Sequence, residues 1–480
     1  MPDPLERLRQ ALEGYYRDEA REHVRRWRGA PDVDPPSVRA ERHRWLVSDG
    51  ALEAFGEATG LRMLQGDAQA ALRAHLQRVR GAMEGAPERD RLVQLAESEV
   101  PLPAGMVTLG ELVADLPTVE GPRRDAIGRA LEGAAEGAAG WLYDGRARVA
   151  SMQDDGSHPD AGPAFDDLVV HAKAMLAASD EAAREAVHAL VGASRHRVPQ
   201  LGDLLHALRA TDLDGLFPPR ERWRRVAADV SALGFERELS ARVRVEPDHR
   251  GLDPRVRLAA VDVPRDLRLA PAPAEHGLLS EIAAADGLGR ALALCLTAPG
   301  LPVELRRPVE GSVPGTLGTL FAQVLAEPPA LVRLRGMGRR ESERVARLAG
   351  AALLLESRLR AAEVILVAGA GASLQAMREQ APDVLRRALA IEVPPPLAVL
   401  VGGTRRGVAA RYRGRVGGLA AWHALRERFD EDWYRNPRAE EPIRAGAHGG
   451  AWLSAESWVT EELGANEDAP RLRLRELAGR

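Results

Sequence analysis

Apolar residues recur at helical spacing along most of the first half of the chain. In residues 4–28, leucines and tyrosines stand at positions 5, 8, 12, 15 and 16, and residues 67–83 repeat the pattern. Apolar positions three and four residues apart form one face of an α-helix. The same spacing predicts further helices at residues 118–152, 164–178, 180–196, 199–210 and 219–233.

The pattern changes near residue 236. Branched apolar residues alternate with arginine in Leu239–Val245 and Arg255–Val261, and Asp266–Leu269 has a similar character. Alternation of this kind is typical of short strands. Helical spacing then returns to the end of the chain. We therefore predict a mainly α fold with a small β-sheet in the middle, divided into an N-terminal helical region, 1–235, and a second region, 236–480.

The composition is that of a globular protein without a strong overall charge. Hydrophobic residues make up 45% of the chain and the formal net charge is −4, so no general attraction to nucleic acid is expected. Two stretches that combine arginine with aromatic residues, 220–225 and 411–415, have acidic or apolar neighbours, which favours solvated helix faces.

The chain shows no signal for a membrane or for export. No apolar run reaches the roughly 18 uncharged residues that a membrane span requires. The charged first residues lack the apolar core of a signal peptide. We expect a cytoplasmic protein with no membrane or nucleic-acid partner, and the sequence does not predict the oligomeric state.

A single cysteine, Cys295, lies within an apolar helical stretch. One cysteine cannot form a disulfide framework, and this context favours a buried structural thiol over a nucleophile.

The helical stretch that contains this cysteine, EIAAADGLGRALALCL at residues 281–296, is the most informative in the chain. Its residues at 282, 285, 289, 292 and 296 recur with a period of about 3.6. In zinc peptidases a comparable helix carries H-E-x-x-H, which places two imidazoles on one face to bind zinc and a glutamate beside them to polarise water. Here the corresponding five residues are Asp-Gly-Leu-Gly-Arg, at 286–290.

Five segments, in this order and spacing, resemble the M3 family of zinc metallopeptidases, the group of thimet oligopeptidase and the oligoendopeptidases. They are Val261–Pro273, Asp286–Leu292, Leu301–Pro328, Arg428–Arg444 and Leu453–Leu472. The resemblance covers residues 240–480. It implies a zincin-like helical fold with a central cleft, and a zinc-dependent oligopeptidase activity in the family.

The resemblance also implies which functional residues of the family this chain has replaced. The two zinc histidines fall on Asp286 and Arg290, the general-base glutamate on Gly287, and the third-ligand glutamate on Gly315. The substrate-binding tyrosine loop falls near residues 406–412, where Tyr412 is the expected retained cleft residue.

These replacements remove the chemistry of a zinc site. Zinc requires about three strong donors, glycine offers no side-chain donor, and a guanidinium is a cation. We therefore expect neither zinc nor another cofactor. Asp286 and Arg290 stand four residues apart on the helix, a spacing that favours an ion pair; the alternative is that Arg290 reaches solvent.

The sequence thus predicts a catalytically inactive M3-like protein that binds a peptide or a protein partner in its cleft. The first alternative is an active zinc oligopeptidase whose ligands lie in another register or whose site has been rebuilt, for instance from Glu275, His276 and Glu281.

A second alternative is a nucleotide-binding protein. The segment VILVAGAGASLQAM, residues 364–377, contains the glycines Gly369 and Gly371 in a G-x-G arrangement. This alternative requires Val364–Val367 to be a strand that leads into a turn. If the segment instead belongs to a long core helix, its small residues serve helix packing. Leu397–Val401 is a similar apolar run that suits a strand or a buried helix.

Overall fold

The computed structural model describes most of the chain. The described residues are 3–479 except 31, 61–62, 65, 103–104, 152–164, 193–197, 247–256, 271–276, 309–310, 370–372 and 451–453. All statements below concern these residues.

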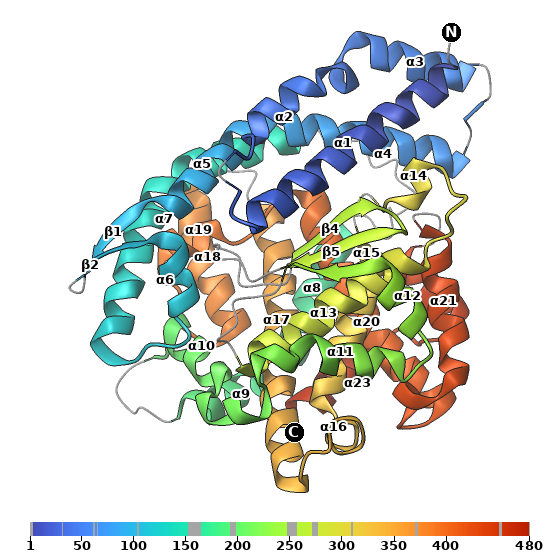
Figure 1. Cartoon of the computed structure of the whole chain (residues 1–480). Coiled ribbons are helices and arrows are strands. Elements are labelled where there is room, and N and C mark those ends of the chain that lie inside the picture. Colours follow the sequence, from blue (N-terminus) through green and yellow to red (C-terminus); the bar gives the residue numbers. More distant parts are fainter. Residues whose placement is uncertain are drawn as a thin grey trace.

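Helices α1 to α5 form a layer at the top of the molecule in Figure 1, and the C-terminal helices pack below it. The helices of the first part are α1 (Pro4–Trp27), α2 (Pro36–Arg42), α3 (Asp49–Gly60), α4 (Gly66–Glu84), α5 (Ala86–Glu97), α6 (Leu109–Asp115), α7 (Gly121–Ser151), α8 (Phe165–Ala178), α9 (Asp180–Val191), α10 (Leu201–Arg209), α11 (Arg222–Ser231) and α12 (Glu236–Arg242). Side-chain hydrogen bonds cap the N-termini of several of these helices. Asp3 caps α1 by accepting a hydrogen bond from the Leu5 amide at 2.9 Å, and Thr108 with Glu111 forms a capping box on α6.

The second part of the chain begins with a small sheet and continues as helices. The strands are β3 (Val243–Val245), β4 (Arg257–Asp262) and β5 (Asp266–Ala270), in the order β3-β5-β4, with β4 antiparallel and β3 parallel to β5. The helices are α13 (Gly277–Leu296), α14 (Val303–Arg306), α15 (Ser312–Ala322), α16 (Pro328–Arg335), α17 (Arg339–Gly369), α18 (Leu374–Leu389), α19 (Pro395–Leu400), α20 (Arg405–Phe429), α21 (Glu440–His448), α22 (Ala455–Ser457) and α23 (Ala469–Ala478).

The predicted mainly helical fold with a central sheet is confirmed, with two local differences. Residues 239–242, predicted to begin a strand, form the end of α12, and only Val243–Val245 are extended. A two-stranded hairpin, β1 (Glu99–Leu102) and β2 (Gly105–Thr108), was not predicted, because its strands are short and largely exposed.

The main hydrophobic core extends from Leu168 on α8 to Leu477 on α23. It therefore packs residues of the predicted N-terminal region, from 165 onward, against the helices of the second region. A separate core joins α1, α3 and α4, and includes Val303 of α14. Cys295 is buried in the main core, and burial raises the pKa of its thiol to about 12, as expected for a structural cysteine.

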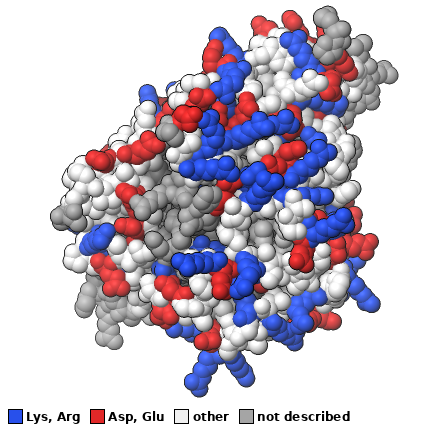
Figure 2. All heavy atoms as spheres, in the orientation of Figure 1, with Lys and Arg blue, Asp and Glu red and all other residues white. Residues whose placement is uncertain are grey.

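Arginines gather over α1 and the β-sheet on the face shown in Figure 2, with acidic residues between them. Arg28 and Arg268 both donate to Glu246, at 2.7 and 3.0 Å.

Among the helices of the described residues, none combines the length and apolar character needed to span a bilayer.

Helices α13 and α20 each approach α15 closely, and glycines allow this approach. A β-carbon added at Gly289 of α13 would collide with the carbonyl oxygen of Leu317 on α15. A β-carbon at Gly414 of α20 would lie 2.9 Å from the α-carbon of Gly315. The obstacle at both positions is main chain, so only a shift of the helices could relieve the contact.

We predict that Gly289→Ala destabilises the protein by about 1–3 kcal/mol, the usual cost of overpacking a core. The control is Gly137→Ala on α7, where a new β-carbon meets nothing within 4 Å. There the better helix propensity of alanine should stabilise the protein by about 0.5–1 kcal/mol. Urea unfolding measures both changes, and a Gly289→Ala variant as stable as the wild type would contradict the close-packing argument.

Candidate functional site

A large cavity lies between the N-terminal helices and the second part of the chain. Its volume is about 1280 Å³, and its walls include residues of α1, α6, α7, α10, α13, α17, α19 and α20. Pockets for small molecules usually measure roughly 300–1,000 Å³. This cavity is thus large enough for a ligand the size of a short peptide.

Helix α13 contributes two charged side chains, Asp286 and Arg290, to the cavity wall. Arg290 Nε donates to Asp286 Oδ2 at 2.6 Å, and Nη2 donates to Oδ1 at 3.2 Å. Both side chains keep about a third or less of their surface exposed, 35% for Arg290 and 26% for Asp286. The predicted ion pair is confirmed. Gly287, between them on the helix, is buried.

Gly315 on α15 lies against the same ion pair. A β-carbon at this position would lie 3.8 Å from Arg290 Nη1 and 3.2 Å from the α-carbon of Gly414. Residues 286, 290 and 315 therefore lie together beside the cavity, although they come from two helices and from sequence positions almost thirty residues apart.

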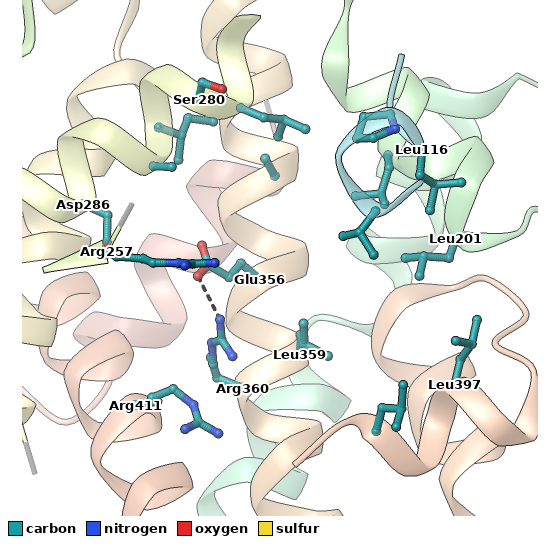
Figure 3. A pocket seen from close by; sticks show the side chains of 18 of the residues that line it. Leu116, Leu201, Arg257, Ser280, Asp286, Glu356, Leu359, Arg360, Leu397 and Arg411 are labelled. Carbon is teal, nitrogen blue, oxygen red and sulfur yellow. Dashed lines mark hydrogen bonds and ion pairs between the residues drawn. The ribbon is translucent and has the colours of Figure 1, made fainter. Parts of the chain in front are cut away.

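The sequence did not predict a second group of charged side chains in the cavity. Glu356 and Arg360 of α17 line it together with Arg411 and Arg415 of α20. Figure 3 shows Glu356 and Arg360 joined by an ion pair, with Nη2 of Arg360 3.4 Å from Oε1 of Glu356. Arg415 Nη2 lies 3.0 Å from the other Glu356 oxygen.

Arg415 corrects the prediction that the stretch 411–415 is a solvated helix face. Its side chain is almost completely buried, and it donates to Ser357 Oγ and to the carbonyl oxygen of Leu353, both at 2.9 Å. The alternation of arginine with small and aromatic residues reflects a helix packed on several sides. The stretch 220–225 is likewise not a simple solvated helix face, since Arg222 is buried and Arg225 binds Glu281 at 2.9 Å.

The charges around Glu356 determine its protonation. Burial alone would raise the pKa of this carboxyl group, but Arg415, Arg360 and Arg290 outweigh burial and lower the pKa to about 2. The side chain lies deep in the molecule and still has 37% of its surface exposed, because it opens on the cavity. Burial has the opposite effect on Arg415, whose pKa it lowers.

Tyr412 lies in the core. Its hydroxyl pairs with His171 Nδ1 at 2.7 Å and contacts Met175 Sδ at 3.2 Å, and burial raises the pKa of the phenol. Tyr412 is absent from the cavity walls formed by the described residues, so the structure does not support the expected cleft position. Its neighbour on the helix, Arg411, lines the cavity instead.

The described residues around the ion pair do not fit a zinc ion. Within the ranges given above, no group of three or more histidine, cysteine, aspartate or glutamate side chains is placed to hold a metal. Asp286 is engaged by Arg290, and guanidinium groups repel a dication. Glu281, a candidate for a rebuilt site, is fully buried and bound by Arg225 and Arg335. Glu275 and His276 lie outside the described residues.

The strand required for nucleotide binding is not present. Val364–Val367 belongs to the last turns of α17, which ends at Gly369, so the interpretation of this run as part of a long core helix is confirmed and the strand of the nucleotide-binding alternative is not formed. Gly371 lies outside the described residues. Residues 397–400 are likewise helical, as part of α19.

Comparison with known proteins identifies the fold. No protein-family model and no curated protein matches the sequence. Among solved structures, the chain is similar to BsuCP, with a TM-score of 0.57 and 12% identity over 99% of this chain and 97% of that one. It is also similar to PZ peptidase A, solved with an inhibitor, with a TM-score of 0.60 and 10% identity over 92% of this chain and 84% of that one. A protein described as oligoendopeptidase F from Bacillus anthracis str. Ames gives a TM-score of 0.57 and 10% identity over 92% and 81%.

These likenesses extend over nearly the whole chain. The protein therefore has the helical fold of the oligoendopeptidase type of M3 metallopeptidase, which confirms the predicted fold class. At 10–12% identity, the comparison establishes the fold alone.

The charge network gives a testable pH dependence. Because the pKa of Glu356 is lowered from 4.5 to about 2 on folding, its contribution to stability is complete above pH 4.5 and is lost as the pH falls toward 2. We predict that Glu356→Gln is less stable than the wild type at pH 7, and that the difference shrinks as the pH falls below 4.5.

Urea unfolding from pH 7 to pH 3 measures this difference. Glu343→Gln, which removes an exposed carboxylate paired with Arg339 on the same helix, serves as the control and should have little effect at any pH. A difference between wild type and Glu356→Gln that stays constant down to pH 3 would contradict the proposed ionic role of Glu356.

Proposed function

We propose that this protein is a catalytically inactive relative of the M3 peptidases that binds a peptide, or an extended segment of a protein partner, in its cavity. The observation that carries the proposal is the Asp286–Arg290 ion pair, which lines the cavity where the family resemblance places the two zinc histidines.

The chemistry of the pair argues against hydrolysis. A zinc peptidase activates water by binding it to a metal held by three protein donors, with a general base beside it. At the corresponding positions this chain has one carboxylate, one guanidinium and two glycines, Gly287 and Gly315. The carboxylate accepts two hydrogen bonds from the guanidinium, so it is not available as a metal ligand without breaking the pair.

The cavity argues for binding. It combines apolar walls with a charged centre, and a volume of about 1280 Å³ accommodates several residues of an extended chain. By this proposal the protein needs no cofactor, acts without nucleic acid or a membrane, and works in the cytoplasm.

The proposal predicts that the protein purified after expression in zinc-supplemented medium carries no stoichiometric zinc and does not cleave oligopeptides. Elemental analysis and a quenched fluorescent oligopeptide library measure the two properties. PZ peptidase A, which has the same fold, is the positive control for the cleavage assay.

One zinc per chain together with cleavage that a chelator abolishes would overturn the proposal. That result would favour the alternative of an active oligopeptidase with a site built from other residues, for which Glu275 and His276 would be the first to substitute.

A further inference from the structure

We propose that the cavity recognises a carboxylate within an otherwise apolar peptide, and that the arginines around the Asp286–Arg290 pair hold this carboxylate. The inference rests on the proposed binding function and adds the chemistry of the ligand. It follows from the excess of positive charge at the centre of the cavity and from the apolar wall opposite.

Among the residues that the structure describes, the centre of the cavity holds more arginines than carboxylates. All five arginines of this group line the cavity: one lies on α13, one on α17, two on α20 and one at the start of β4. Two of its three carboxylates, one on α13 and one on α17, also line the cavity, and the third, also on α17, binds Arg360 and Arg411. The arginines are Arg257, Arg290, Arg360, Arg411 and Arg415, and the carboxylates are Asp286, Glu356 and Glu363. The group therefore has two more positive charges than negative ones.

The carboxylates are shared between arginines. Glu363 accepts from Arg360 Nη1 at 2.7 Å and from Arg411 Nε at 3.1 Å. Glu356 lies 3.4 Å from Arg360 and 3.0 Å from Arg415. Each guanidinium carries five N–H donors in a planar fork, an arrangement that suits a carboxylate. In the view of Figure 3, Arg257 extends toward Glu356 and Arg411 faces the same space.

The arginines also repel one another. Burial is the largest influence that lowers the pKa of Arg415, and the charges of Arg360 and Arg290 lower it further. The charge interactions take place below the surface, where solvent screens them less than at the surface. A ligand carboxylate that binds here would reduce this repulsion and gain charge-assisted hydrogen bonds.

Leucine side chains line part of the cavity wall across from these arginines. Figure 3 shows Leu116, Leu201 and Leu397 facing the space across from Arg360 and Arg411. Leu204 and Leu208 of α10 and Leu400 of α19 belong to the same wall. A matching ligand therefore carries apolar side chains next to its acidic group, which excludes a uniformly acidic peptide.

Isothermal titration calorimetry with three hexapeptides tests the inference. The first is blocked at both ends and has glutamate among leucine and serine residues, the second has glutamine in place of the glutamate, and the third is the glutamine peptide with a free carboxyl terminus. We expect the glutamate peptide to bind about tenfold more tightly than the blocked glutamine peptide, since a charge-assisted hydrogen bond to a carboxylate contributes that much. Equally tight binding of the third peptide would assign recognition to a chain terminus and would also support a carboxylate site.

Substitutions of the charged residues test the predicted direction of each change in affinity. Arg257→Gln and Arg290→Gln should each weaken binding of the glutamate peptide about tenfold, whereas Glu356→Gln removes a competing carboxylate and should tighten it. Arg339→Gln, which removes an arginine whose side chain is 90% exposed at the start of α17, is the matched control and should leave binding unchanged. Circular dichroism and thermal unfolding of every variant show whether it is folded before it is titrated.

Equal affinity for the glutamate peptide and both glutamine peptides would overturn the carboxylate inference and leave peptide binding intact. Weaker binding by a folded Glu356→Gln variant would also overturn it, because a purely structural role of the network predicts a loss with every substitution. Failure of all three peptides to bind would contradict the inference, whereas zinc-dependent cleavage would contradict the proposed function itself.

Discussion

The close packing of α15 between α13 and α20 is the constraint on which the site depends. Gly289 lets α13 approach the main chain of α15, and Gly414 lets α20 approach it from the other side. Helices at ordinary distances would separate Asp286 and Arg290 on α13 from the arginines of α20. The packing therefore brings these charged side chains together at one part of the cavity wall.

If the protein is inactive as proposed, this arrangement explains physically how the fold does without a metal. A zinc site gathers carboxylate and imidazole donors around a cation that must be bound from solution. Here the cationic groups are arginine side chains, and Asp286, Glu356 and Glu363 neutralise them in part. On the proposed account the centre of the cavity remains positively charged, but it has no activated water. On the same account, these residues exclude zinc and attract an acidic ligand.

The sequence predicted the fold class because the family-like segments follow one another in the order found in the M3 family. It predicted the helices and the sheet because apolar periodicity depends on near neighbours in the chain. The Asp286–Arg290 pair was predictable for the same reason, since four residues separate its members on one helix. Glu356 and Arg415 were not predicted, because their interaction depends on the packing of two helices far apart in sequence. Local alternation also could not distinguish an arginine that faces solvent from one such as Arg415, which is buried between helices.

The central claim is that residues 286, 290 and 315 occupy the positions of metal ligands and have lost that chemistry. It is tested most directly by zinc titration of a triple variant, Asp286→His, Arg290→His and Gly315→Glu, beside the wild type and beside a control with Ala291→His in place of Arg290→His. The control places the second imidazole on a different face of α13. We expect one zinc bound by the folded triple variant and none by the wild type or the control. A folded triple variant that binds no zinc, or a wild type that binds it equally well, would contradict the account.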